Sequence, residues 1–170
     1  LGVGGENRGE LVVVSKSSGD ELTHEMILEE HAGKIIIGGA FLKHRAFNKA
    51  KQVGVAGIIS GGFDYTDLSI ILGYSLGVAI TGSEEIGPSL IITEGFGKMS
   101  IASRTYELLK SNEGKFGSIN GSTQIRAGVI RPEILVSLDE STKSLDIIDE
   151  SDMAISEGSP VRVIREPLFG

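Results

Sequence analysis

Three carboxylates near the middle of the chain are of the residue type that general acid–base catalysis requires. Glu84 and Glu85 follow one short apolar run, and Glu94 follows the next. Carboxylates in a cleft act as general bases or bind hard cations. Since neighbouring residues on an extended backbone point apart, Glu84 and Glu85 face one substrate only where the backbone bends. Two interpretations of these glutamates stay open: the general base of an enzyme, and solvated loop charges.

Histidine, serine and cysteine offer little for nucleophilic catalysis or metal binding. The chain has no cysteine, which removes thiol nucleophiles, thiolate metal sites and disulfide bonds. His24 and His31 are seven residues apart, whereas zinc-binding helices place their ligands three or four residues apart. Ser83, in Gly82-Ser83-Glu84, has no evident histidine partner for nucleophilic catalysis. We therefore expect no metal and no cofactor, and the catalytic residues of an enzyme stay unknown.

Glycine follows four successive apolar runs, and the chain contains 24 glycines in 170 residues, about twice the usual ~7 %. The carboxyl ends of parallel strands share one edge, where open α/β sheets bind ligands. Glycine there leaves backbone N–H groups accessible to an anion, although no dinucleotide-binding or P-loop motif is complete. The alternative is that these glycines only form tight turns. The predicted ligand-binding residues are Gly38, Gly39, Gly61, Gly62, Thr81, Gly82, Ser83, Glu84, Glu94, Gly95 and Gly97.

Alternating strands and helices are expected to position these residues. Apolar stripes at helical spacing predict helices over 41–53 and 101–111. Residues 116–119 and 123–130, joined by Asn120-Gly121, predict a hairpin with a type I′ turn. Continuous apolar runs predict four buried strands of one sheet, at 34–37, 55–60, 78–81 and 89–93.

The order of these elements predicts an α/β fold. We expect a three-layer β/β/α or α/β sandwich with a mostly parallel central sheet and an antiparallel extension, because the helices are too few to cover both faces of a six-stranded sheet. The central sheet is expected within 11–111 and a hairpin-rich part within 115–138. The chain length favours one α/β domain over 1–155 and the start of a small β module over 156–170.

Composition limits the partners of the chain. Its net charge of −7 argues against a general nucleic-acid surface, and no apolar run approaches the ~20 residues that span a membrane. The absence of cysteine suits a reducing, cytoplasmic compartment. The chain begins at Leu1 with neither an initiator methionine nor a signal peptide. We therefore expect flanking domains in a longer protein; a homo-oligomer is an open alternative.

Residues 33–63, GKIIIGGAFLKHRAFNKAKQVGVAGIISGGF, join a strand, a glycine pair, a helix and a second strand. In this order they resemble the core of swivelling β/β/α domains. That group includes the mobile phosphohistidine domains of phosphoenolpyruvate-utilising enzymes and the protease-associated domains. The phosphohistidine motif is a glycine pair followed by Thr-Ser-His, whereas Gly38-Gly39 is followed here by Ala40-Phe41-Leu42. This departure argues against a phosphocarrier role.

The last ten residues, VRVIREPLFG, are similar to the opening of a KOW motif, a small β-structure of ribosomal proteins and transcription elongation factors. The resemblance implies that the parent protein continues into a small β-barrel that binds RNA or protein. Nucleic acid would then contact only that module. As a whole, the chain looks like the middle domain of a bacterial or archaeal multidomain protein.

Three functions are consistent with these patterns. The leading hypothesis is a non-catalytic domain that senses or positions a small anionic molecule at the glycine-rich strand ends. The second is a scaffold for protein assembly within a KOW-containing protein. The third is an enzyme domain that uses Glu84, Glu85 or Glu94 as its general base.

Overall fold

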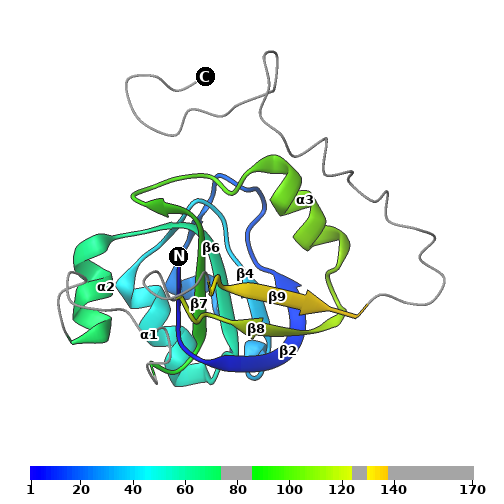
Figure 1. The fold of residues 1–170 in the computed structure, drawn as a ribbon, viewed down its shortest axis with the longest axis horizontal. Helices are drawn as coiled ribbons and strands as arrows, with labels where there is room; N and C mark the ends of the chain where they lie inside the picture. The colour runs from blue at the N-terminus through cyan, green and yellow to red at the C-terminus, as the bar shows by residue number, and fades with distance from the viewer. Residues whose placement is uncertain (74–85, 124–129, 138–170) are drawn as a thin grey trace, which may run out of the picture. The chain divides into compact units, whose positions relative to one another are not determined.

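The structure is a computed structural model that describes residues 1–73, 86–123 and 130–137. The described residues lie within one compact unit, Leu1–Ser137, and they combine helices and strands in an α/β fold (Figure 1). The predicted strand 78–81 lies outside the described residues. No helix among the described segments is long and apolar enough to cross a membrane.

The strands form a curled mixed sheet. β2, β4, β6 and β7 are parallel to their neighbours in this group, whereas β1, β8 and β9 pair antiparallel at the two sides. Two short strands, β3 (Glu21–Leu22) and β5 (Phe41–Leu42), pair with each other, and β5 also pairs with β6. The order across the sheet is β1 (Gly2–Val3), β7 (Ser89–Phe96), β6 (Gly57–Phe63), β4 (Ile35–Ile37), β2 (Glu6–Val13), β8 (Phe116–Asn120) and β9 (Glu133–Val136).

One continuous stretch of chain supplies both an edge and the middle of this sheet. Val3 in β1 pairs with Leu90 of β7. The chain then bends at Gly4, whose φ of 91° is a conformation that favours glycine, and β2 continues between β4 and β8. Because the same stretch pairs at two distant places in the strand order, the sheet curls.

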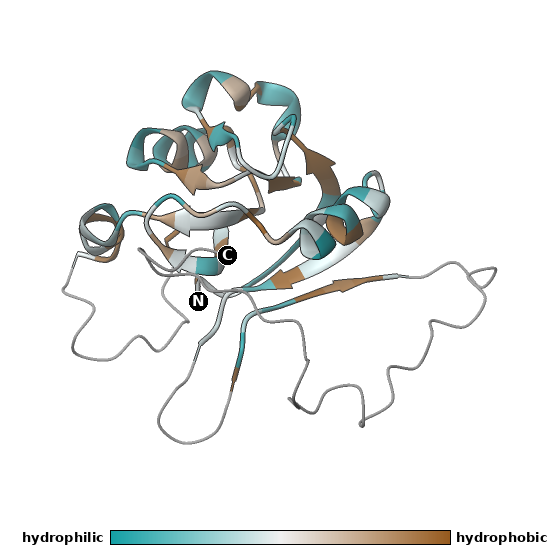
Figure 2. Ribbon diagram, turned by 90° about the horizontal axis from the view of Figure 1, so that it is seen from above, coloured by the Kyte–Doolittle hydropathy of each residue, from teal (hydrophilic) through white to brown (hydrophobic). Residues whose placement is uncertain are grey.

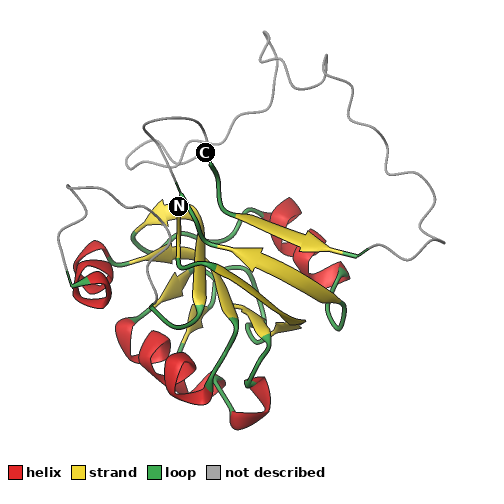
Figure 3. Ribbon diagram, turned by 60° about the horizontal axis from the view of Figure 1, so that its bottom comes forward, coloured by secondary structure: helices red, strands yellow, loops and turns green. Residues whose placement is uncertain are grey.

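The parallel strands are buried on both faces because their isoleucines alternate between two cores. Ile36 and Ile58 pack in one core with residues of α1 (His44–Val53) and α2 (Tyr65–Leu72). Ile35 and Ile59 pack in the other with residues of α3 (Ser103–Ser111). Burial of one such side chain contributes roughly 1.5–3 kcal/mol. Figure 2 shows hydrophobic residues on the strands and hydrophilic residues on much of the helices, and Figure 3 shows α1 and α3 on different sides of the strands.

Most of the predicted elements occur where expected, with shifted ends. The runs 34–37, 55–60 and 89–93 are confirmed as strands β4, β6 and β7 of one sheet. The helix predicted over 41–53 is confirmed only from His44, because Phe41 and Leu42 pair with β3 and β6 as strand β5. The helix predicted over 101–111 is confirmed as α3.

The prediction of a hairpin across Asn120-Gly121 is wrong. β8 pairs instead with β9, and Ile119 lies opposite Ile134 rather than opposite Ser122, as a two-residue turn would require. The physical reason is that residues after Asn120 contact β1: the Thr123 hydroxyl accepts from the Gly2 N–H at 3.0 Å. Residues 124–129 lie outside the described part of the chain.

Candidate functional site

The glycines of the predicted site converge at the carboxyl edge of the parallel strands. Gly62 of β6 pairs with Gly95 of β7 in parallel register, and the Gly61 N–H donates to the Gly39 carbonyl at 2.8 Å. The glycines that the structure describes therefore lie at one edge, as expected for parallel strands, and a common ligand-binding crevice among them stays a prediction. We call this cluster the glycine edge, formed by Gly38, Gly39, Gly61, Gly62, Gly95 and Gly97. Of the other predicted site residues, Thr81, Gly82, Ser83, Glu84 and Glu85 lie outside the described residues.

Backbone carbonyls lie against three members of the glycine edge, Gly39, Gly61 and Gly62. A Cβ atom on Gly39 would overlap the Asp20 carbonyl, one on Gly61 the Met99 carbonyl, and one on Gly62 the Gly97 carbonyl. Hydrogen bonds join these segments: the Ala40 N–H donates to Asp20 at 2.6 Å, and the Met99 N–H donates to Ala40 at 3.0 Å. At this edge the glycines therefore permit close contact between backbones.

The expectation of accessible backbone N–H groups is wrong at three of these glycines. The N–H of Gly38 donates to Ile59 at 2.8 Å, that of Gly61 donates to Gly39, and that of Gly97 donates to Phe63 at 3.0 Å. Moreover, Gly61 and Gly62 lie inside β6 rather than after it, because the strand continues to Phe63. A ligand-binding role of the glycine edge stays a prediction without this support.

The polar side chains of the glycine edge also make structural hydrogen bonds. Ser60 is fully buried, and its hydroxyl lies 3.3 Å from the Gly39 carbonyl and 3.1 Å from the Gly62 carbonyl. The Glu94 carboxylate accepts from the N–H of Ala102, the residue before α3, at 2.9 Å. Glu94 therefore helps to anchor the start of α3, and its role as a general base stays a prediction.

A shallow depression of about 500 Å³ lies beside the glycine edge, at the starts of α1 and α2. Leu42 of β5 pairs with Phe63 of β6 in parallel register, so the residues that follow the two strands emerge at the same edge. The prediction based on glycines missed this depression. The sequence does contain a signal for it, because charged residues come directly after each of two strands, where the next helix begins. Its lining consists of Phe41, Lys43, His44, Arg45, Asp64 and Asp67.

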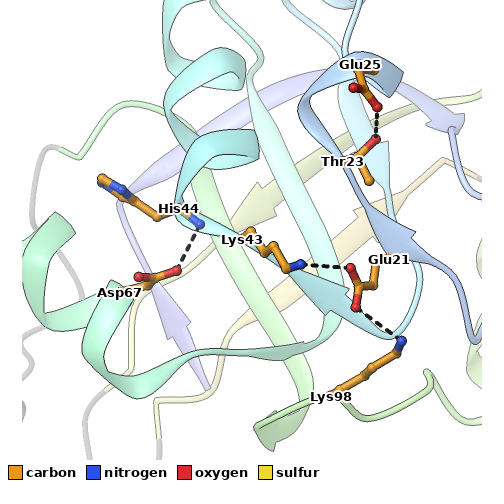
Figure 4. A network of polar contacts seen from close by, with 7 residues as sticks. All are labelled: Glu21, Thr23, Glu25, Lys43, His44, Asp67 and Lys98. Atoms are coloured by element: carbon orange, nitrogen blue, oxygen red, sulfur yellow. Dashed lines mark hydrogen bonds and ion pairs between the residues drawn. The ribbon is translucent and has the colours of Figure 1, made fainter.

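The lysine of the depression is held by a carboxylate from outside it. Glu21 lies 3.1 Å from the Lys43 ammonium and 3.1 Å from the Lys98 ammonium, and Figure 4 shows it between the two. Hydrogen bonds to Lys43 and Lys98 lower the pKa of Glu21 below its ordinary value. Lys43 is therefore directed toward Glu21, whose negative charge offsets that of the ammonium group.

The two aspartates of the depression each fix the start of a helix. Asp67 Oδ2 accepts from the N–H of His44, the first residue of α1, at 3.0 Å. Asp64 Oδ1 accepts from the N–H groups of Thr66 and Asp67 at 2.8 and 3.1 Å, and so caps α2. These backbone donors hold both carboxylates in position at the wall of the depression.

Arg45, the arginine of the depression, is exposed. Arg45 is the second residue of α1, and within residues 1–73, 86–123 and 130–137 no ion pair involves it. A guanidinium offers five N–H donors in a planar fork that fits a carboxylate or a phosphate. Arg45 is therefore the group best able to bind an anion at this site.

The three histidines lie in three different elements. His31 is buried, and its Nδ1 accepts from the Leu28 N–H at 3.1 Å; burial lowers its pKa. His24 lies in a separate 3₁₀ turn, His24–Met26, and His44 begins α1. In the part of the chain that the structure describes, no group of three histidine or carboxylate side chains is arranged to hold a metal ion.

Comparisons with known proteins leave the depression as the main guide to function. No family model, curated protein or solved structure matches this chain. The resemblances to swivelling β/β/α domains and to a KOW motif stay predictions.

Proposed function

We propose that this domain binds a small anionic molecule in the depression at the starts of α1 and α2, and that it senses or positions this molecule rather than converting it. The observation that carries the proposal is Arg45, an exposed guanidinium at the wall of the depression without an ion pair among the described residues. Hydrogen bonds between a guanidinium and a carboxylate or phosphate are about twice as strong as those between neutral groups.

The location of the depression supports the same function. Ligands of open α/β sheets bind outside the carboxyl ends of the strands, and the depression lies directly after the carboxyl ends of β5 and β6. The carboxylates of this edge support a non-catalytic role, because Asp64, Asp67 and Glu94 each accept a backbone N–H at the start of a helix. These bonds give each carboxylate a role in holding the fold, which supports binding without catalysis.

The test is an NMR titration of the ¹⁵N-labelled chain with inorganic phosphate, adenosine monophosphate and butanoate. We expect at least one of them to shift the amide signals of 41–45 and 64–67. Arg45→Gln should weaken that binding about tenfold, because it removes a charged fork of donors. The matched control is Arg104→Gln, since Arg104 is also exposed and is the second residue of α3.

Two results would contradict the proposed function. One is that none of the three anions shifts the amides of the depression at tens of millimolar. The other is that Arg45→Gln and Arg104→Gln weaken binding equally, since the anions would then respond only to the overall charge of the chain.

A further inference from the structure

We infer that the ligand of the depression is a small zwitterion, a molecule that carries an ammonium group as well as its anionic group. The inference rests on the proposed function and narrows its ligand class. It starts from the charges that line the depression, two cationic side chains and two carboxylates: Lys43, Arg45, Asp64 and Asp67.

The opposite charges of the depression do not pair with each other. Lys43 pairs with Glu21, outside the lining. For Arg45, Asp64 and Asp67, no ion pair occurs within the described ranges. A simple anion at Arg45 would therefore also experience the repulsion of two nearby carboxylates, whereas a zwitterion complements both kinds of charge.

The two carboxylates have unused acceptor oxygens and a fixed orientation. Asp67 accepts through Oδ2 and Asp64 through Oδ1. No hydrogen bond to the second oxygen of either occurs among the residues described. An ammonium group has three N–H donors, more than the two free oxygens require. Because backbone N–H groups already hold the carboxylates, little side-chain ordering would oppose binding.

The start of α1 is not itself the anion site in this arrangement. Figure 4 shows Asp67 beside the backbone nitrogen of His44, and the Lys43 side chain directed toward Glu21. The first N–H of the helix thus already donates a hydrogen bond to the carboxylate of Asp67. This leaves the Arg45 guanidinium for the anionic group of the ligand, and Phe41, which is half-buried and lines the depression, for its carbon atoms.

The test compares four probes of similar size on the full chain by amide shift titration: butanoate, butylamine, 2-aminobutanoate and 4-aminobutanoate. The two aminobutanoates place the charges at different separations. We expect one of them to bind about tenfold more tightly than butanoate, since the added charge-assisted hydrogen bonds are strong ones. Butylamine alone should bind more weakly than that zwitterion.

Asp67→Asn should change the affinity for a zwitterion and the affinity for a simple anion in opposite directions. Asparagine keeps an oxygen for the His44 N–H but removes the negative charge, so the aminobutanoate should bind more weakly and butanoate more tightly. Asp64→Asn serves as a second variant where Asp67→Asn does not fold. The control is Glu107→Gln, which removes a carboxylate from the exposed side of α3.

The outcomes separate the inference from the proposed function. The inference is overturned, and the proposed function stands, when butanoate binds as tightly as both aminobutanoates. It is also overturned when Asp67→Asn and Asp64→Asn each weaken butanoate and the aminobutanoate alike, because the aspartates would then be only structural. The inference also fails when butylamine binds as tightly as the zwitterions, because the anionic group would then add nothing. Both statements fail only when these four probes, phosphate and adenosine monophosphate all leave the amides of the depression unshifted.

Discussion

Two neighbouring regions at the carboxyl edge of the sheet differ in what fills them. At the glycine edge, backbone carbonyls of Asp20, Gly97 and Met99 lie where side chains would otherwise be. In the adjacent depression, the residues that follow β5 and β6 carry charged side chains around open space. Gly39, Gly61 and Gly62 of the glycine edge are therefore part of the packed interior, whereas the depression is accessible to a ligand.

This difference shows that glycine at the end of a buried strand has two possible uses. It can leave backbone donors open to a ligand, or it can let another stretch of backbone come close. Here the second use holds for Gly39, Gly61 and Gly62. Substitutions that fill the glycine edge should therefore reduce stability, and substitutions that change the charges near the depression should change binding.

The largest effect is expected from a methyl group at the glycine edge. Gly62→Ala would place its Cβ against the Gly97 carbonyl, and we expect it to lower the free energy of unfolding by about 3 kcal/mol, because backbone must move to admit the methyl group. The free energy of unfolding is measured by urea unfolding followed by far-UV circular dichroism. This signal needs no tryptophan, and the chain has none.

Gly5→Ala is the control for this substitution. Apart from its two chain neighbours, no described residue has an atom within 4 Å of a Cβ on Gly5. The unfolding free energy of Gly5→Ala should therefore stay within about 0.5 kcal/mol of that of the native chain. Equal losses for Gly62→Ala and Gly5→Ala would show that the glycine edge is not tightly packed. The contrast between a packed glycine edge and an open depression would then not hold.

A smaller loss is expected from the buried hydroxyl of the same region. Ser60→Ala removes the donor to the Gly39 and Gly62 carbonyls, and we expect it to cost about 1 kcal/mol of unfolding free energy. Ser111→Ala, at an exposed hydroxyl that donates to Leu108, should cost less in the same urea experiment. A Ser60→Ala chain with native stability would mean that Ser60 is not needed to join β6 to Gly39, which follows β4.

The smallest effect concerns binding at the depression. Glu21→Gln should release Lys43 and Lys98 from a competing carboxylate, and so raise the affinity for phosphate several-fold. The two lysines lower the pKa of Glu21 from its ordinary 4.5, so its ion pairs favour the folded state above that value and are lost as the pH falls through the lowered pKa. The increase in affinity should thus be measurable throughout the neutral range by amide shift titration.

Glu29→Gln is the control for Glu21→Gln, because Glu29 pairs with Lys49 of α1 at 3.0 Å and lines no part of the depression. It should leave phosphate affinity nearly unchanged. Equal increases in phosphate affinity for both variants would indicate an effect of net charge alone. Glu21 would then have no specific influence on binding at the depression.

Several features of the fold follow from the sequence because they depend on neighbouring residues. The isoleucines at 35–37 predict a strand buried on both faces, and the structure divides them between two cores. Gly54 and Gly73 end α1 and α2 in the left-handed conformation that glycine favours. The convergence of the glycines also follows, because parallel strands end at one edge.

The content of that edge was decided by tertiary structure alone. The crossing of Asp20 over Gly39, and of Gly97 over Gly62, joins residues that lie about twenty or more positions apart, and no local pattern predicts such a contact. The same holds for Glu21, which reaches Lys43 and Lys98 from β3, and for Asp67, which holds the start of α1 from another helix. Local sequence determines which strands form and how they end, whereas long-range backbone contacts determine which of those ends remain open to a ligand.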